Sequence, residues 1–160
     1  MALSVFLDTS VLLAGLVDLG QQSAPAQLIL HSVAEKTIPA PATAWHCCLE
    51  FFSVATRLPP EFRLTPTDAA HLLDEEVFGR MTVHDLPAGD RRAMLRMLVD
   101  DNIGGGRVYD VHIAEIARAA GARVIVTDNR RHFVSALRHD LRVETPSEFV
   151  ARLRKSPTQK

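Results

Sequence analysis

The 160-residue chain has almost no net charge, because 18 Lys and Arg stand against 19 Asp and Glu. Proteins that coat nucleic acid through their overall charge are strongly basic, so the near-zero net charge disfavours this class. A neutral protein can still bind phosphates through a local basic patch. Long apolar runs are lacking too: the longest fall well below the ~20 residues that cross a bilayer. Asp8 interrupts the first run before a secretory signal can form. We therefore expect no membrane association and a cytoplasmic location.

Cysteine is equally scarce. Cys47 and Cys48 are adjacent, where a disulfide would be strained and a zinc site would lack its usual ligand spacing. They predict buried thiols in a reducing compartment. Internal repeats and low-complexity segments are missing, and 47% hydrophobic with 23% charged residues is typical of one globular domain. We assign residues 1–155 to that domain and 156–160 to a frayed tail.

The chain does contain an alternation of strands and helices. Apolar runs at 3–7 and 123–127 are typical of strands buried on both faces. Two prolines place 38–41 at a sheet edge or in a loop. Further strands are expected at 81–86 and 141–144, and helices at 25–35, 43–57, 65–77, 88–99, 108–120, 131–137 and after a capping box at 145–148. This order predicts an α/β fold with a central, mostly parallel sheet of four to five strands and helices on both faces.

The two clearest strands each end in a carboxylate, Asp8 and Asp128. Ligands of open α/β sheets bind beyond the carboxyl ends of the strands, so both acids should face one site. In the helix predicted over 108–120, Asp110 shares a face with apolar residues, whereas Glu115 belongs to the solvent side. A carboxylate on an apolar face needs a cation, a hydrogen-bond network or a raised pKa.

Three converging acids would repel one another at neutral pH unless a divalent cation held them ionised. Oxygen ligands suit Mg²⁺ or Mn²⁺, and such a metal can activate water against a phosphodiester. The pattern therefore favours phosphoryl chemistry. Each acid also has a structural interpretation: Asp8 as an N-cap, Asp110 as a first-turn acid, Glu50 as a solvated residue on the polar stripe of 43–57, and Asp128 as a turn residue.

Other candidate ligands are weaker. His46 and Glu50 lie four residues apart on one helical face, but a second histidine at useful spacing for a transition metal is missing. Trp45, Phe51 and Phe52 are expected in the core rather than stacking on RNA.

Three segments carry a family resemblance: FLDTSVLLA at 6–14, PAPATAWHCCLEFFSVATR at 39–57 and GRVYDVHIAEIARAAGARVIVTDNRRHF at 106–133. Together they resemble the PIN-domain ribonucleases, most closely the VapC-type toxins of bacterial toxin–antitoxin pairs. The resemblance spans nearly the full chain. It implies a three-layer PIN-like fold and a Mg²⁺-dependent endoribonuclease that hydrolyses RNA phosphodiester bonds with metal-activated water.

The resemblance also implies roles for individual residues. The catalytic, metal-binding acids would be Asp8, Glu50, Asp110 and Asp128. The fourth departs from the family pattern, because Asn129 follows Asp128 and either side chain can complete the set. Ser10 and Thr127 would orient acids or waters through their hydroxyls.

Nearby arginines would contact RNA phosphates: Arg107, Arg130 and Arg131. The alternative for each is a solvated or salt-bridged side chain.

A VapB-like antitoxin is the implied partner, inserting a segment, often an arginine, into the acidic crevice. Family members usually form homodimers, for which the apolar helices around 28–33 and 45–54 offer a surface unless they are core. Two other functions remain open. One is a different metal-dependent phosphohydrolase or DNA nuclease that uses the same acids. The other is a catalytically silent PIN-like binding module, in which Asp128 and Asn129 mark a degraded site.

Overall fold

A five-stranded parallel sheet runs through the middle of the chain in the computed structural model, which describes residues 4–155. Within that range the side chains of Val134, Ser135, Leu137, Arg138 and His139 are not described, and the predicted tail at 156–160 lies outside the described residues. The strands are β1 (Val5–Leu7), β2 (Pro41–Ala44), β3 (Thr82–His84), β4 (Val124–Val126) and β5 (Arg142–Glu144). Their order is β3-β2-β1-β4-β5, and every neighbouring pair is parallel.

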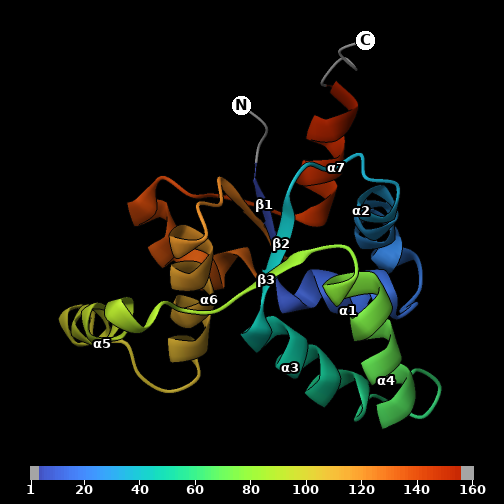
Figure 1. Cartoon of the computed structure of the whole chain (residues 1–160), viewed down its shortest axis with the longest axis horizontal. Helices are drawn as coiled ribbons and strands as arrows, with labels where there is room; N and C mark the ends of the chain where they lie inside the picture. Colours follow the sequence, from blue (N-terminus) through green and yellow to red (C-terminus); the bar gives the residue numbers. More distant parts are fainter. Residues whose placement is uncertain (1–3, 156–160) are drawn as a thin grey trace.

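Helices cover both faces of the sheet (Figure 1). On one side pack α1 (Thr9–Leu16), α2 (Ala24–Ala34) and α7 (Pro146–Lys155), with α3 (Trp45–Ala55) against α1 and α4 (Pro66–Leu72) against α3. On the other side lie α6 (Arg107–Ala119), α5 (Arg91–Asp100) and the 3₁₀ segment η4 (Arg130–His139). Short segments complete the chain: η1 (Gln21–Ser23), the π-helical η2 (Leu73–Phe78) and η3 (Ala88–Asp90). The predicted three-layer α/β fold is confirmed.

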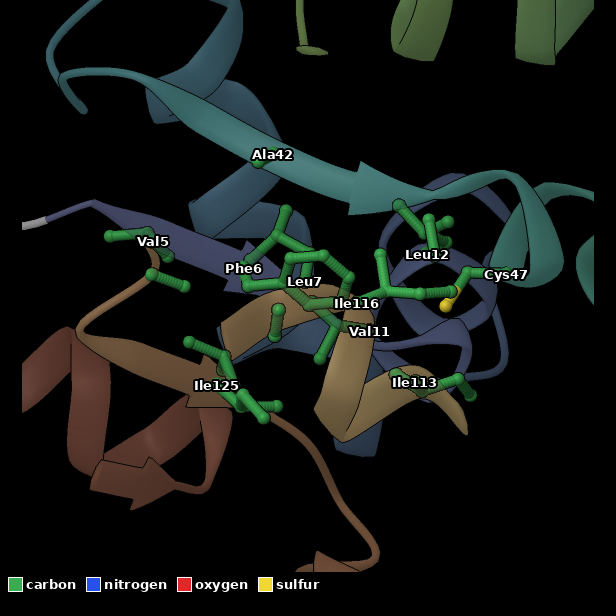
Figure 2. Packing of buried hydrophobic residues seen from close by; sticks show 14 of the residues in the cluster. Val5, Phe6, Leu7, Val11, Leu12, Ala42, Cys47, Ile113, Ile116 and Ile125 are labelled. Atoms are coloured by element: carbon green, nitrogen blue, oxygen red, sulfur yellow. The ribbon is translucent and has the colours of Figure 1, made fainter. Parts of the chain in front are cut away.

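The core forms around the central strand β1. Its three residues are buried and pair in register with β4, Val5 opposite Val124 and Leu7 opposite Val126. Figure 2 shows Phe6 and Leu7 among apolar side chains from α1 and α6. Because helices cover both faces of these strands, nothing in them is exposed, which explains their unbroken apolar sequence. The parallel register also brings the carboxyl ends of β1 and β4 to the same edge.

The second strand corrects the expectation for the proline-rich segment. Residues 38–40 form a loop as expected, but Pro41 begins β2, which lies inside the sheet between β1 and β3 and not at its edge. Pro41 occupies the first strand position, where a missing N–H is tolerated. The helix expected from 43 therefore begins at Trp45 instead. The helix α1 directly after β1 was not predicted, since it is apolar almost throughout and shows little amphipathic period.

Two expectations about burial were wrong. Trp45 is 43% exposed, whereas Phe51 is fully buried and Phe52 is partly buried against the core. Glu115 is only 6% exposed and does not lie on a solvent side. Its carboxylate accepts a hydrogen bond from Arg118 Nε at 3.0 Å, which partly offsets the cost of burying the charge.

No helix within residues 4–155 combines the length and the apolarity that a membrane crossing requires.

Candidate active site

Asp8 lies at the carboxyl end of β1 and is only 4% exposed. Thr127, which directly follows β4, donates its hydroxyl to Asp8 Oδ2 at 2.7 Å. Ser10 donates to the same oxygen at 3.2 Å. The predicted orienting role of the two hydroxyls thus has a geometric basis: side chains from two segments 117 residues apart hold one carboxylate oxygen.

The charge on Asp8 is poorly compensated. Burial raises the pKa of its carboxyl, and the hydrogen bonds from Thr127, the Thr9 backbone and Ser10 lower it by less. The negative charge of Glu50 raises it further. The groups that stabilise the ionised form are all neutral donors, so a positive charge placed here would be strongly favoured.

Glu50 is carried by α3 and is connected to Asp8 through the intervening residue of the first helix. Thr9 donates its hydroxyl to Glu50 Oε2 at 3.2 Å, and His46 Nε2 lies 3.5 Å from the same oxygen. The hydrogen bond from His46 is the main reason that the pKa of Glu50 is lowered. Glu50 therefore stays ionised at neutral pH beside a second acid.

Asp110 projects from the first turn of α6 and is half-buried. Burial raises the pKa of its carboxyl, the charge of Glu50 adds to that, and His132 opposes it from 3.6 Å. Asp110 and Glu50 line one pocket of about 350 Å³ together with His46, Leu49, Gly106 and Tyr109. Asp110 therefore shares a half-buried pocket with Glu50, which is its main neighbour of like charge.

Asp128 and Asn129 both touch the site through their backbone. The Asp128 N–H donates to Ser10 Oγ at 3.0 Å, and the Asn129 N–H donates to Thr127 Oγ1 at 3.0 Å. The Asp128 side chain is exposed, and its pKa is raised by partial desolvation, with no contribution from another described acid. Asp8, Glu50 and Asp110 are therefore electrostatically coupled, and Asp128 stands apart from them.

The coupled acids influence one another in pairs: Glu50 raises the pKa of Asp8 and that of Asp110, with which it shares the pocket. Within residues 4–155, no three His, Cys, Asp or Glu side chains lie close enough to hold one metal ion together. Mg²⁺, however, is commonly held by one or two carboxylates, with waters and substrate phosphate completing its shell. An all-oxygen donor set with an undercompensated buried charge fits such an ion.

The three predicted RNA-binding arginines differ in their surroundings. Arg107 is exposed at the start of α6, and its charge lowers the pKa of Asp110. Arg131 is exposed. Arg130 contacts the Glu148 carboxylate at 2.7 Å, so for this residue the salt-bridged alternative holds.

Sequence reasoning missed two residues of the site, His112 and Tyr109. The Nδ1 atoms of His112 and His46 are 3.1 Å apart, and the Tyr109 and His46 rings are 5.5 Å apart. The sequence lacks a second histidine near His46 along the chain, and the fold supplies one in His112, which is 66 residues away in sequence. Its pKa is lowered by burial and by His46. Only the approach of α6 to α3 creates this contact.

A parallel α/β sheet with hydroxyl-braced carboxylates at its carboxyl edge is the framework of a phosphodiester-cleaving domain. The chain belongs to the PIN domain family, whose sequence profile matches residues 4–131. Nucleases of this family generally depend on divalent metals. The predicted resemblance is confirmed.

Individual known proteins agree with this membership. Ribonuclease VapC40 of Mycobacterium tuberculosis is 32% identical over 128 residues, covering 77% of this chain and 85% of the relative. The fold is shared with M. tuberculosis VapC20, described as a sarcin-ricin loop cleaving toxin (TM-score 0.58, 18% identity, 76% of this chain and 87% of that one). It is also shared with DNA-bound VapBC from Salmonella typhimurium (TM-score 0.60, 19% identity, 90% and 98%).

Proposed function

We propose that this chain is a metal-dependent endoribonuclease and the toxin of a VapBC-type toxin–antitoxin pair. Family membership and the similarity to Ribonuclease VapC40 support the class. The observation that carries the proposal is the electrostatic coupling of Glu50 to both Asp8 and Asp110, three acids that belong to separate segments of the chain. Residues 1–155 form the nuclease domain in this proposal.

The acids have distinct tasks in the proposed site. Mg²⁺ or Mn²⁺ would be held by a pair of these acids, Asp8 with Glu50 or Glu50 with Asp110, and waters, substrate phosphate and Asp128 or Asn129 would complete its shell. When bound, the metal would supply a Lewis acid and an activated water for hydrolysis of the RNA phosphodiester. Glu50 is kept ionised by His46 and Thr9, so it can accept a proton or a hydrogen bond from water.

The hydroxyls of Ser10 and Thr127 keep the Asp8 carboxylate in one orientation and partly offset its burial. A group fixed in this way needs little reorganisation when the substrate arrives. Arg107 and Arg131 remain candidates for contacts to RNA phosphates, because both are exposed. Arg107 lies close enough to Asp110 to lower its pKa, and Arg131 follows the carboxyl end of β4 along the chain.

The proposed protein partners rest on the same site. A VapB-like antitoxin that inserts an arginine would place a guanidinium against Glu50 and Asp110, a favourable charge-assisted contact. For the homodimer, α2 is mostly core, since Ile29, Leu30 and Val33 are buried. Leu28 on α2 is 39% exposed and Trp45 on α3 is 43% exposed, so each helix keeps at least one large apolar side chain for such a surface.

Cleavage assays test the proposal directly. The purified chain should cut 5′-labelled single-stranded RNA internally in the presence of Mg²⁺ and stop cutting when the metal is chelated. Asp110→Asn should abolish cleavage, and Asp74→Asn, which changes an exposed acid on η2, should not. Equal or faster hydrolysis of single-stranded DNA or nitrophenyl phosphate would favour the phosphohydrolase alternative. Neither cleavage nor Mg²⁺-dependent stabilisation would favour the silent binding module.

A further inference from the structure

The pocket beside the acids has an apolar and aromatic rim that the proposed hydrolysis does not use. Tyr109 is the single tyrosine of the chain and is 59% exposed, and Leu49 is 53% exposed. Both line the 350 Å³ pocket that contains Glu50 and Asp110. Large apolar side chains exposed at the mouth of a polar pocket favour binding of a ligand that has both kinds of surface.

The chain builds this rim by one repeated arrangement. Each acid directly follows an apolar residue on its own helix, Leu49 before Glu50 on α3 and Tyr109 before Asp110 on α6. Consecutive helical residues project about 100° apart, so both members of a pair reach the pocket only if it lies between their two directions. The two helices therefore present a charged and an apolar side chain each to one space.

The His46 ring packs against the Tyr109 ring. The His46 and Tyr109 rings lie 5.5 Å apart with planes tilted by 46°, and His46 also contacts Glu50. Tyr109 is thus connected to the acidic centre through one intervening ring. A group resting on Tyr109 would share one pocket with a phosphate placed near Glu50 and Asp110.

We propose that Tyr109 and Leu49 form a subsite for one unpaired base of the RNA, next to the phosphodiester that is cut. The inference rests on the proposed ribonuclease function and deepens it, because it names the side chains that contact a base beside the cut. Proteins read single-stranded RNA by stacking splayed bases on aromatic side chains. A pocket of about 350 Å³ is large enough to hold one such base.

Tyrosine variants test the subsite. Base stacking on an aromatic side chain amounts to roughly 5- to 150-fold in affinity, so Tyr109→Ala should raise KM for a short single-stranded RNA within that range. The value of kcat should change little, because the ring contacts the base and not the reacting phosphate. Tyr109→Phe keeps the ring and should behave like the parent chain. Val99→Ala removes an exposed apolar side chain on α5, outside this pocket, and should have no effect.

Abasic substrates identify the contact. In the parent chain, one abasic position beside the cut should raise KM as much as Tyr109→Ala does. In the Tyr109→Ala variant the same abasic position should cost nothing more. Cleavage with an unchanged KM in Tyr109→Ala, or a loss that is equal for all abasic positions, would overturn the subsite and leave the ribonuclease intact. A parent chain that neither binds nor cuts RNA would overturn both, and weakened binding of a protein partner alone would assign Tyr109 to that partner.

Discussion

Replacing Asp8 with asparagine should abolish cleavage and at the same time stabilise the fold. Thr127 and Ser10 both donate to one oxygen, Oδ2, so the amide oxygen of Asp8→Asn can accept both hydrogen bonds. The variant loses the buried negative charge, which is disfavoured by burial and by Glu50, and weakens the hydrogen bond from the Thr9 backbone, so the expected gain is the difference between these two effects. The negative charge that would let Asp8 bind a metal ion thus destabilises the fold when no metal is bound.

The size of the stabilisation depends on the cost of burying the Asp8 charge with only neutral hydrogen-bond donors around it. We expect a net gain of roughly 1 to 3 kcal/mol, which is the range for relieving a buried, imperfectly compensated polar group. For a chain of this length about 2–4 °C accompanies each kcal/mol, so Tm should rise by roughly 2 to 12 °C.

The pH dependence of stability tests separately whether the Asp8 charge destabilises the fold. The folded chain binds a proton at Asp8 more tightly than the unfolded chain, whose ordinary pKa is 3.8. Stability of the parent chain therefore falls as pH rises from that value through the folded pKa of Asp8, and the full penalty is present above it. The Tm difference between Asp8→Asn and the parent should be largest near neutral pH and vanish towards pH 3.8.

Differential scanning fluorimetry over this pH range, with 2 mM EDTA and then with excess Mg²⁺, measures all of these effects. Magnesium should raise the Tm of the parent and leave that of Asp8→Asn unchanged, and Asp74→Asn is the matched exposed control. A variant that is less stable than the parent at pH 7 without metal, or that still cuts RNA, would refute the reasoning.

Three further predictions concern single contacts. Thr127→Val removes the 2.7 Å hydrogen bond to Asp8 at equal volume, so urea denaturation should show a loss of about 1.5–3 kcal/mol, with slower cleavage; an unchanged midpoint would contradict it. Gly15→Ala places a Cβ 2.6 Å from Leu30 Cδ2 where α1 meets α2, and thermal denaturation should show a cost of about 1–3 kcal/mol that is absent in Gly89→Ala, which has open space. Asp128→Ala should slow cleavage by about tenfold or more and Asn129→Ala by less; the reverse order would transfer the fourth position to the amide.

Local sequence determined the scaffold of this protein. The unbroken apolar runs of β1 and β4 predicted strands buried on both faces, and a carboxylate directly after each run placed Asp8 and Asp128 at one edge of the sheet. Both inferences depend only on the period and polarity of adjacent residues, which a strand converts directly into position. The family resemblance, carried by the segments around Asp8, Glu50 and Asp110, was confirmed for the same reason: its motifs are contiguous.

Tertiary structure alone decided which side chains meet. The burial of Glu115, the exposure of Trp45 and the contact between His46 and His112 depend on how α3, α5 and α6 approach one another in space. Helical periodicity states which residues share a face but not what that face meets. The pocket shared by Tyr109, Glu50 and Asp110 therefore exists only once the sheet has set the separation and angle of the helices that line it.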